Sequence, residues 1–147
     1  MKLSTKVEYG LISLVDIAVH SQSGDVVTVI SIAERQNISK TYLEQILTPL
    51  RIAGIITATK GSQGGYTLAD HPKNIRVSDI LNALDRTLLS VTSDGDSKGD
   101  PAIVCALKQT VWDQLDNAFS SIANQTTLQD LMDAYSSNSG GAIMFYI

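Results

Sequence analysis

Residues Ser39–Tyr66 read SKTYLEQILTPLRIAGIITATKGSQGGY, and the organisation of the fold can be worked out from this segment. Its first half has apolar residues at helical spacing; Ser39 is a candidate N-cap and Gly54 a natural residue just beyond a helix. Its second half consists of two β-branched or aromatic runs on either side of a glycine-rich centre. The segment therefore predicts a helix followed by a β-hairpin. Pro49 should bend this helix or remove one backbone hydrogen bond near its last turn.

Two helices are predicted before this segment. An apolar stripe from Ser4 to about Ser21 predicts the first, and Thr28 is a candidate N-cap for a short helix that ends at Gln36. A tight turn at Asn37 leads into the segment above. Two short helices joined by a tight turn and followed by a hairpin have the order of a winged helix-turn-helix, whose second short helix enters the DNA major groove. A generic small α+β domain is the alternative.

A long helix is predicted in the second half of the chain, from Asp100 and Pro101 to about Asn124. Its apolar residues recur every three or four positions, more broadly than one intramolecular seam requires. We therefore expect a dimerisation helix, although the stripe could belong wholly to the intramolecular core. The predicted dimer-interface residues are Val104, Leu107, Val111, Leu115, Ala118 and Ile122.

The remaining segments are short. Val77–Leu84 is predicted to be a helix, Ser90–Gly99 a mobile polar loop, and Thr127–Tyr135 a last short helix before a flexible spacer over residues 136–141 and an apolar end. The predicted fold class is mainly α with a small β-hairpin. Residues 1–76 form the winged helix-turn-helix region; residues 77–147 supply the connecting helix, the loop (90–99), the dimerisation helix (100–124) and the C-terminal helix with its tail.

Charge is distributed unevenly along the 147 residues, whose net charge is −4. Residues 1–76 hold eight basic and six acidic side chains, a charge of +2, whereas residues 77–147 hold three and nine, a charge of −6. An anionic partner is therefore expected at the N-terminal half. The apolar runs are too short to cross a bilayer and the N-terminus lacks the apolar core of a signal peptide, so we expect a cytoplasmic protein without a membrane partner.

The sequence offers no constellation of catalytic or metal-binding residues. His20 and His71 are its only histidines and Cys105 its only cysteine, so we expect no enzyme, no disulfide, no metal and no cofactor. The Gly61–Gly65 run is not a phosphate-binding loop, because no Gly-Lys-Ser/Thr follows it and it joins two strands. Cys105 is either a redox-sensing thiol or, as is commoner within an apolar helical pattern, an inert buried residue.

Cations and hydrogen-bond donors gather around the predicted recognition helix and hairpin. Phosphate contacts position a protein on DNA, and base-edge contacts specify the sequence. The Gln45 side chain can form hydrogen bonds with the edge of adenine, and the Glu44 carboxylate can accept one from a cytosine amino group. Alternatively, Glu44 could be a solvated helix residue and Tyr42 a core residue. In the hairpin, the slim Gly64-Gly65 pair would let the backbone approach DNA. The predicted DNA-binding residues are Lys6, Ser39, Lys40, Thr41, Tyr42, Glu44, Gln45, Arg51, Lys60, Gly64 and Gly65.

Several motifs occur together in this order: YLEQ at Tyr42–Gln45, PLR at Pro49–Arg51, GGY at Gly64–Tyr66 and SDIL at Ser78–Leu81. Over nearly its whole length the chain resembles the IscR, NsrR and CymR family of dimeric bacterial transcription regulators. Its C-terminal features, Trp112, the TTL run at Thr126–Leu128 and the ending MFYI, resemble the CymR branch in particular, which represses cysteine metabolism.

The resemblance implies a homodimer held by the long helix, with two winged heads that bind a palindromic operator and repress transcription. Many relatives hold an iron–sulfur cluster through three cysteines, but Cys105 stands alone here, so no cluster is expected. CymR-like members act in complex with cysteine synthase (O-acetylserine thiol-lyase), and Ile147 is a candidate for insertion into that enzyme. Two alternatives stay open: a redox- or ligand-responsive regulator of another regulon, and a winged-helix adaptor without DNA binding, which the net charge and Glu8 favour.

Overall fold

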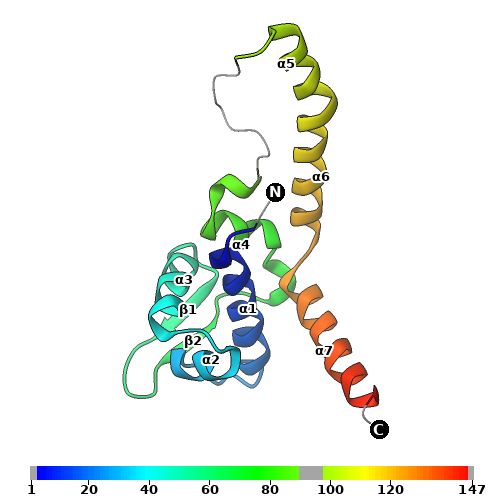
Figure 1. The fold of residues 1–147 in the computed structure, drawn as a ribbon. Coiled ribbons are helices and arrows are strands. Elements are labelled where there is room, and N and C mark those ends of the chain that lie inside the picture. The colour runs from blue at the N-terminus through cyan, green and yellow to red at the C-terminus, as the bar shows by residue number, and fades with distance from the viewer. Residues whose placement is uncertain (1–2, 90–97, 146–147) are drawn as a thin grey trace.

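The computed structural model describes residues 3–89 and 98–145, which form mainly helices around one small hairpin (Figure 1). The predicted fold class is confirmed. The elements are α1 (Thr5–His20), α2 (Val29–Gln36), α3 (Lys40–Ile52), β1 (Ile56–Thr59), β2 (Gly65–Leu68), α4 (Val77–Leu84), α5 (Pro101–Leu107), α6 (Asp113–Gln125) and α7 (Leu128–Phe145). Short 3-10 turns lie at Pro72–Asn74 and Arg86–Leu89, and a π-helical turn, Lys108–Trp112, joins α5 to α6.

The first three helices begin at capping side chains. The hydroxyl groups of Ser4, Thr28 and Ser39 each accept a hydrogen bond from the backbone amide three residues further on, at 3.3, 3.1 and 3.2 Å. Each bond satisfies an amide that the helix itself leaves unpaired. Between α2 and α3, Asn37 takes the left-handed backbone conformation (φ 54°), which makes the tight turn possible. The predicted helix-turn-helix is therefore present.

The hairpin that follows α3 is antiparallel, with Ile56 opposite Leu68. Val27, in the connection between α1 and α2, pairs with Tyr66 through two backbone hydrogen bonds of 2.8 Å. The hairpin is thereby tied back to the helix-turn-helix. Together α1, α2, α3 and this hairpin form a winged helix-turn-helix.

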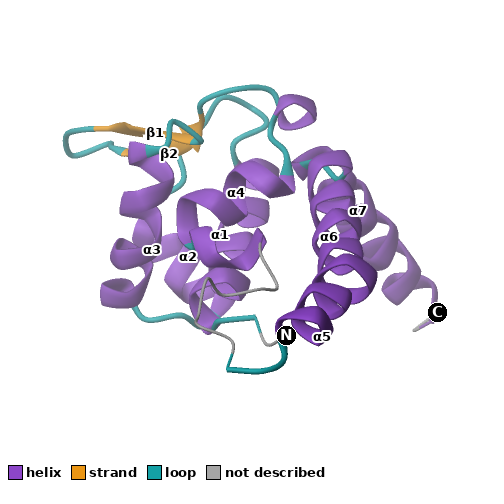
Figure 2. Ribbon diagram, turned by 90° about the horizontal axis from the view of Figure 1, so that it is seen from above, coloured by secondary structure: helices purple, strands orange, loops and turns teal. Residues whose placement is uncertain are grey.

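One apolar core joins the two halves of the chain, and α1 is its central element. Helix α1 contacts α2, α3, α4 and α7, and Figure 2 shows it with α4 between the hairpin side and the α6–α7 side of the molecule. The core continues across all of these elements; its fully buried side chains include Leu14, Ile17, Leu43, Leu47, Ile80 and Leu128. Because α4 and the start of α7 belong to this core, they pack against α1 and stabilise the winged helix.

A buried ion pair fixes α2 against α1. The side chain of Asp16 is inaccessible to solvent and accepts hydrogen bonds from Arg35 Nε (2.9 Å), Arg35 Nη2 (2.7 Å) and Gln36 Nε2 (2.7 Å). Burial raises the pKa of Asp16, but the hydrogen bonds from Arg35 and Gln36 and the Arg35 charge outweigh it, so the pKa lies below its usual value. Since one tight turn separates α2 from α3, this clamp also orients the recognition helix.

Helix α7 is longer than the sequence indicates. The predicted flexible spacer over residues 136–141 is wrong, because the helix runs on to Phe145. The helix starts at a capping box, in which the Thr127 amide donates to Asp130 Oδ2 (2.9 Å) and the Asp130 amide to Thr127 Oγ1 (3.2 Å). Its first turns pack on α1, and once a helix is nucleated each further residue adds a backbone bond, which offsets the weak propensity of serine and glycine.

The predicted long helix is present as one rod composed of α5, the π-helical turn and α6. It projects well beyond the rest of the molecule (Figure 1), and it starts where Asp100 caps the amide of Ala102 at 2.9 Å. Most of the predicted mobile loop, residues 90–97, and the C-terminal Ile147 lie outside the described residues. Within the described parts of the chain, no helix has the length and apolar character needed to cross a membrane.

Candidate nucleic-acid interface

Helix α3 buries one face and presents the other to solvent. Leu43, Ile46, Leu47 and Leu50 lie in the core, so the side chains between them point outward. The exposed set contains Lys40, Thr41, Glu44 and Gln45, as predicted. The Ser39 hydroxyl is committed to capping the helix, where it accepts from the Tyr42 amide.

A shallow groove brings the start of α1 beside this exposed face. It is lined by Lys6 from α1 and by Thr41, Glu44, Gln45 and Thr48 from α3. Sequence reasoning missed Thr48, although it stands one turn beyond Glu44 and helical spacing alone could have identified it. The Thr48 hydroxyl donates to the Glu44 carbonyl at 2.7 Å, which leaves its oxygen free to accept.

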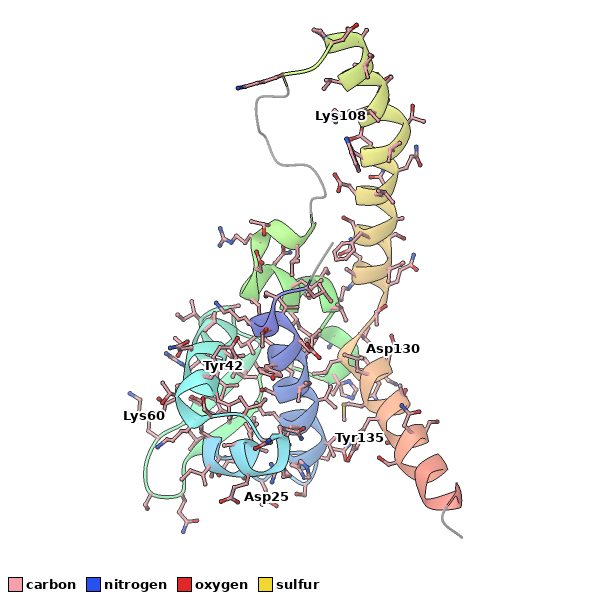
Figure 3. The ribbon with its side chains drawn as sticks, in the orientation of Figure 1. Asp25, Tyr42, Lys60, Lys108, Asp130 and Tyr135 are labelled. Carbon is pink, nitrogen blue, oxygen red and sulfur yellow. The ribbon has the colours of Figure 1, made fainter. Side chains whose placement is uncertain are left out.

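Three exposed cations surround the recognition helix. Lys40 is in the first turn of α3, Arg51 in its last turn, and Lys60 beside the end of β1 in the hairpin loop. Figure 3 shows Lys60 projecting outward on the side of the molecule that carries Tyr42 and α3. None of the three forms an ion pair with a described residue. Their charges are therefore available to phosphate groups.

Tyr42 is half-buried at the base of α3. Its ring meets the ring of Tyr9 in α1 edge to face, with centroids 5.8 Å apart and planes at 88°. The ring packs against the core, as the alternative interpretation of Tyr42 proposed. A DNA contact from Tyr42 stays a prediction, and its structural role is to hold α3 against α1.

The two glycines of the hairpin are required by the hairpin itself. A Cβ on Gly64 would overlap the carbonyl oxygen of Thr59, and a Cβ on Gly65 would stand 2.8 Å from the carbonyl oxygen of Val27. Both backbones therefore approach their neighbours more closely than any side chain allows. The hairpin's own geometry thus explains both glycines. That they also let DNA approach the backbone closely stays a prediction.

A winged helix-turn-helix whose recognition helix exposes amide, hydroxyl and cationic groups defines a DNA-binding module of the kind that transcription regulators use. The chain belongs to the Rrf2 family, described as iron-dependent transcriptional regulators, whose family model matches residues 3–134. This match confirms the predicted family of IscR-, NsrR- and CymR-like regulators.

Similar proteins cover the chain almost end to end. It is 40% identical over 132 residues to Protein rrf2 of Nitratidesulfovibrio vulgaris, which covers 90% of this chain and 87% of that protein. It is 35% identical over 147 residues to the transcriptional regulator CymR of Bacillus subtilis, which covers 100% of both. Among solved structures, CymR, the global cysteine regulator of B. subtilis, matches with a TM-score of 0.76 and 32% identity over 91% of this chain and 98% of that one.

The residues of this chain do not fit an iron–sulfur cluster. The sequence contains one cysteine, and the described residues include no group of three His, Cys, Asp or Glu side chains that could hold a metal ion. Cys105 itself is exposed, so its interpretation as a buried residue is wrong. The physical reason is that α5 stands away from the rest of the molecule, where no core covers it.

Proposed function

We propose that this chain is a dimeric, cluster-free repressor that binds a palindromic operator and controls genes of sulfur and cysteine metabolism. The observation that carries the proposal is the similarity to CymR over the full length of both chains. A single cysteine agrees with a regulator that works without an iron–sulfur cluster. The sensed signal would then reach the protein through a partner.

The exposed face of α3 supports a mode of DNA recognition. With α3 in the major groove, Gln45 and Glu44 reach base edges, Gln45 as a donor–acceptor pair for adenine and Glu44 as an acceptor for cytosine. Lys40 and the hairpin's Lys60 neutralise phosphates on either side. Each phosphate that is neutralised makes the slope of log affinity against log salt concentration more negative by about 0.9.

The C-terminal half supports a protein partner. Residues 77–147 carry a charge of −6, which disfavours a second contact with DNA. This half of the chain is therefore available to bind a protein. We take cysteine synthase as that partner, because this enzyme acts with the CymR-like regulators that the chain resembles.

The test measures binding of the purified protein to its own promoter and to promoters of cysteine biosynthesis, at low and physiological salt, with and without cysteine synthase. We expect tight, salt-sensitive binding that the enzyme strengthens. Binding to unrelated promoters only would agree with a transcription regulator but would refute its control of sulfur and cysteine genes. No binding to any promoter would favour the adaptor.

Three variants separate the roles within the interface. Lys40→Ala should weaken binding to all sequences and flatten the salt slope by about 1, because one phosphate contact is lost. Gln45→Ala should instead blur the preference at one base per half-site, worth about 1–3 kcal/mol. Lys73→Ala is the control, since Lys73 is an exposed lysine on the 3-10 turn that packs against α7. An unchanged base preference in Gln45→Ala would overturn the base-reading role.

A further inference from the structure

A cavity of about 410 Å³ lies between α1, the end of α2 and α7. We call it the α1–α7 cavity. Its walls are mostly apolar, and the side chains that form them are half-buried, each packed on the core and open to the cavity; they include Leu11, Val15, Val19 and Leu131. Natural sites for small molecules have volumes of about 300–1,000 Å³ and walls of this kind. The cavity is therefore large enough to hold a small organic molecule.

The cavity exists because α7 is held against α1 only at its beginning. Leu128 and Met132, in the first turns of α7, are 0% and 4% exposed, whereas residues 133–138 are all exposed. Figure 1 shows the two helices diverging from the start of α7 toward its C-terminal end. On the α7 side the wall includes Ala134, whose methyl group is too small to fill the space between the helices.

Polar groups without a partner stand at both ends of this apolar space. At the inner end, Gln36 donates its amide nitrogen to Asp16, but its Oε1 atom receives no hydrogen bond from a described residue. At the rim, the same holds for the Tyr135 hydroxyl and the Asn138 side chain, and Figure 3 shows Tyr135 on the side of α7 that faces α1. These groups offer an occupant both hydrogen-bond donors and acceptors.

The electrostatics of the cavity favour a neutral occupant. The carboxylate of Asp16 is balanced by Arg35 and fully committed to the clamp between α1 and α2. Among the described residues that line the cavity there is no lysine, no arginine and no second carboxylate. An ion that entered would lose its hydration without gaining a counter-charge. The chemical class that fits is therefore a neutral molecule with an apolar body and one or two hydrogen-bonding groups.

We propose that the α1–α7 cavity binds such a molecule and that this binding is coupled to DNA binding. Asp16 and Gln36 both line the cavity and both belong to the clamp that fixes α2 against α1. Since one tight turn joins α2 to α3, an occupant that moves either side chain changes the orientation of the recognition helix. The inference goes beyond the proposed function, because it adds a small-molecule signal to the protein partner.

The test uses indole as the probe, since indole is neutral and combines an apolar bicycle with one N–H donor. Methyl NMR spectra of the full-length protein are recorded during a titration to millimolar indole. We expect saturable shifts confined to the methyl groups of Leu11, Val15, Val19 and Leu131. Ala134→Trp fills the cavity and should raise the indole dissociation constant at least about tenfold. Ser136→Trp is the matched control, because this exposed position lies about 200° around the helix from Ala134.

Two results would overturn the binding site. One is the absence of localised shifts, or equal indole affinity in Ala134→Trp and Ser136→Trp when both variants melt at the wild-type temperature. The other is an indole affinity that falls as the protein concentration rises, because a second copy of the chain would then cover the cavity.

The coupling is tested by repeating the titration with saturating promoter DNA. The indole dissociation constant should change at least about twofold, and indole should change the promoter affinity by the same factor, because coupling between two binding sites is reciprocal. An indole affinity that DNA leaves unchanged would overturn the coupling. A protein that binds no promoter would refute the proposed function and the coupling together, whereas the titration without DNA would still decide the binding site.

Discussion

Replacing Asp16 by asparagine should destabilise the protein, because the clamp between α1 and α2 depends on a carboxylate. The Asp16 side chain is fully buried and receives two bonds from Arg35 and one from Gln36, all between 2.7 and 2.9 Å. Asparagine has the same shape, but its amide nitrogen cannot accept the second Arg35 bond and its charge is zero. The guanidinium would then face a buried amide NH2 group, which is also a donor, and would lose its counter-charge.

The magnitude follows from burial on each side of the pair. Removing one partner of a fully buried ion pair costs about 3–5 kcal/mol. The Arg35 side chain is 35% exposed and can recover part of this from water, so we expect about 2–4 kcal/mol for Asp16→Asn. For a chain of this size that corresponds to a fall in melting temperature of about 5–15 °C.

The assay is urea and thermal unfolding of the wild type and variant between pH 3 and pH 7. The folded-state pKa of Asp16 is depressed, so its contribution is complete above the unfolded value of about 3.9 and is lost as the pH falls through the folded value. The Asp16→Asn variant should not show this loss of stability at low pH. Asp25→Asn is the control, since Asp25 is exposed and accepts a hydrogen bond from the hydroxyl group of its near neighbour Ser23. Equal stability of Asp16→Asn and Asp25→Asn at pH 7 would refute the clamp.

Three further substitutions test the wing and α7. Gly64→Ala should destabilise the protein by about 1–3 kcal/mol through overlap with a hairpin carbonyl, whereas Gly140→Ala, where a Cβ meets open space inside a helix, should stabilise it by about 0.5–1 kcal/mol in the same denaturation assay. Asp130→Ala removes one half of the capping box and should cost about 1 kcal/mol. If Asp133→Ala, further along the same helix, costs as much, capping is not the cause.

The local architecture could be predicted from the sequence because its signals are local. Thr28 and Ser39 mark helix starts, Asn37 tolerates the left-handed turn between the helices, and the change of period after Gly54 marks the hairpin. Each of these depends on a few adjacent residues whose backbone preferences act alone. The exposed face of α3 follows from the same reasoning, since the period of the helix separates core from solvent.

The longer-range features could not be predicted from the sequence and are visible only in the folded chain. The partnership of Asp16 with Arg35 joins residues 19 positions apart that no local pattern links, and the glycine at position 64 is explained by a carbonyl across the hairpin. Helix α7 runs past its polar stretch because its start is capped and packed on α1. In the rod, Lys108–Trp112 wind as a π-helix, where a constant helical period predicts one unbroken α-helix. Sequence periodicity assumes one helix geometry, and only tertiary packing shows where that geometry changes.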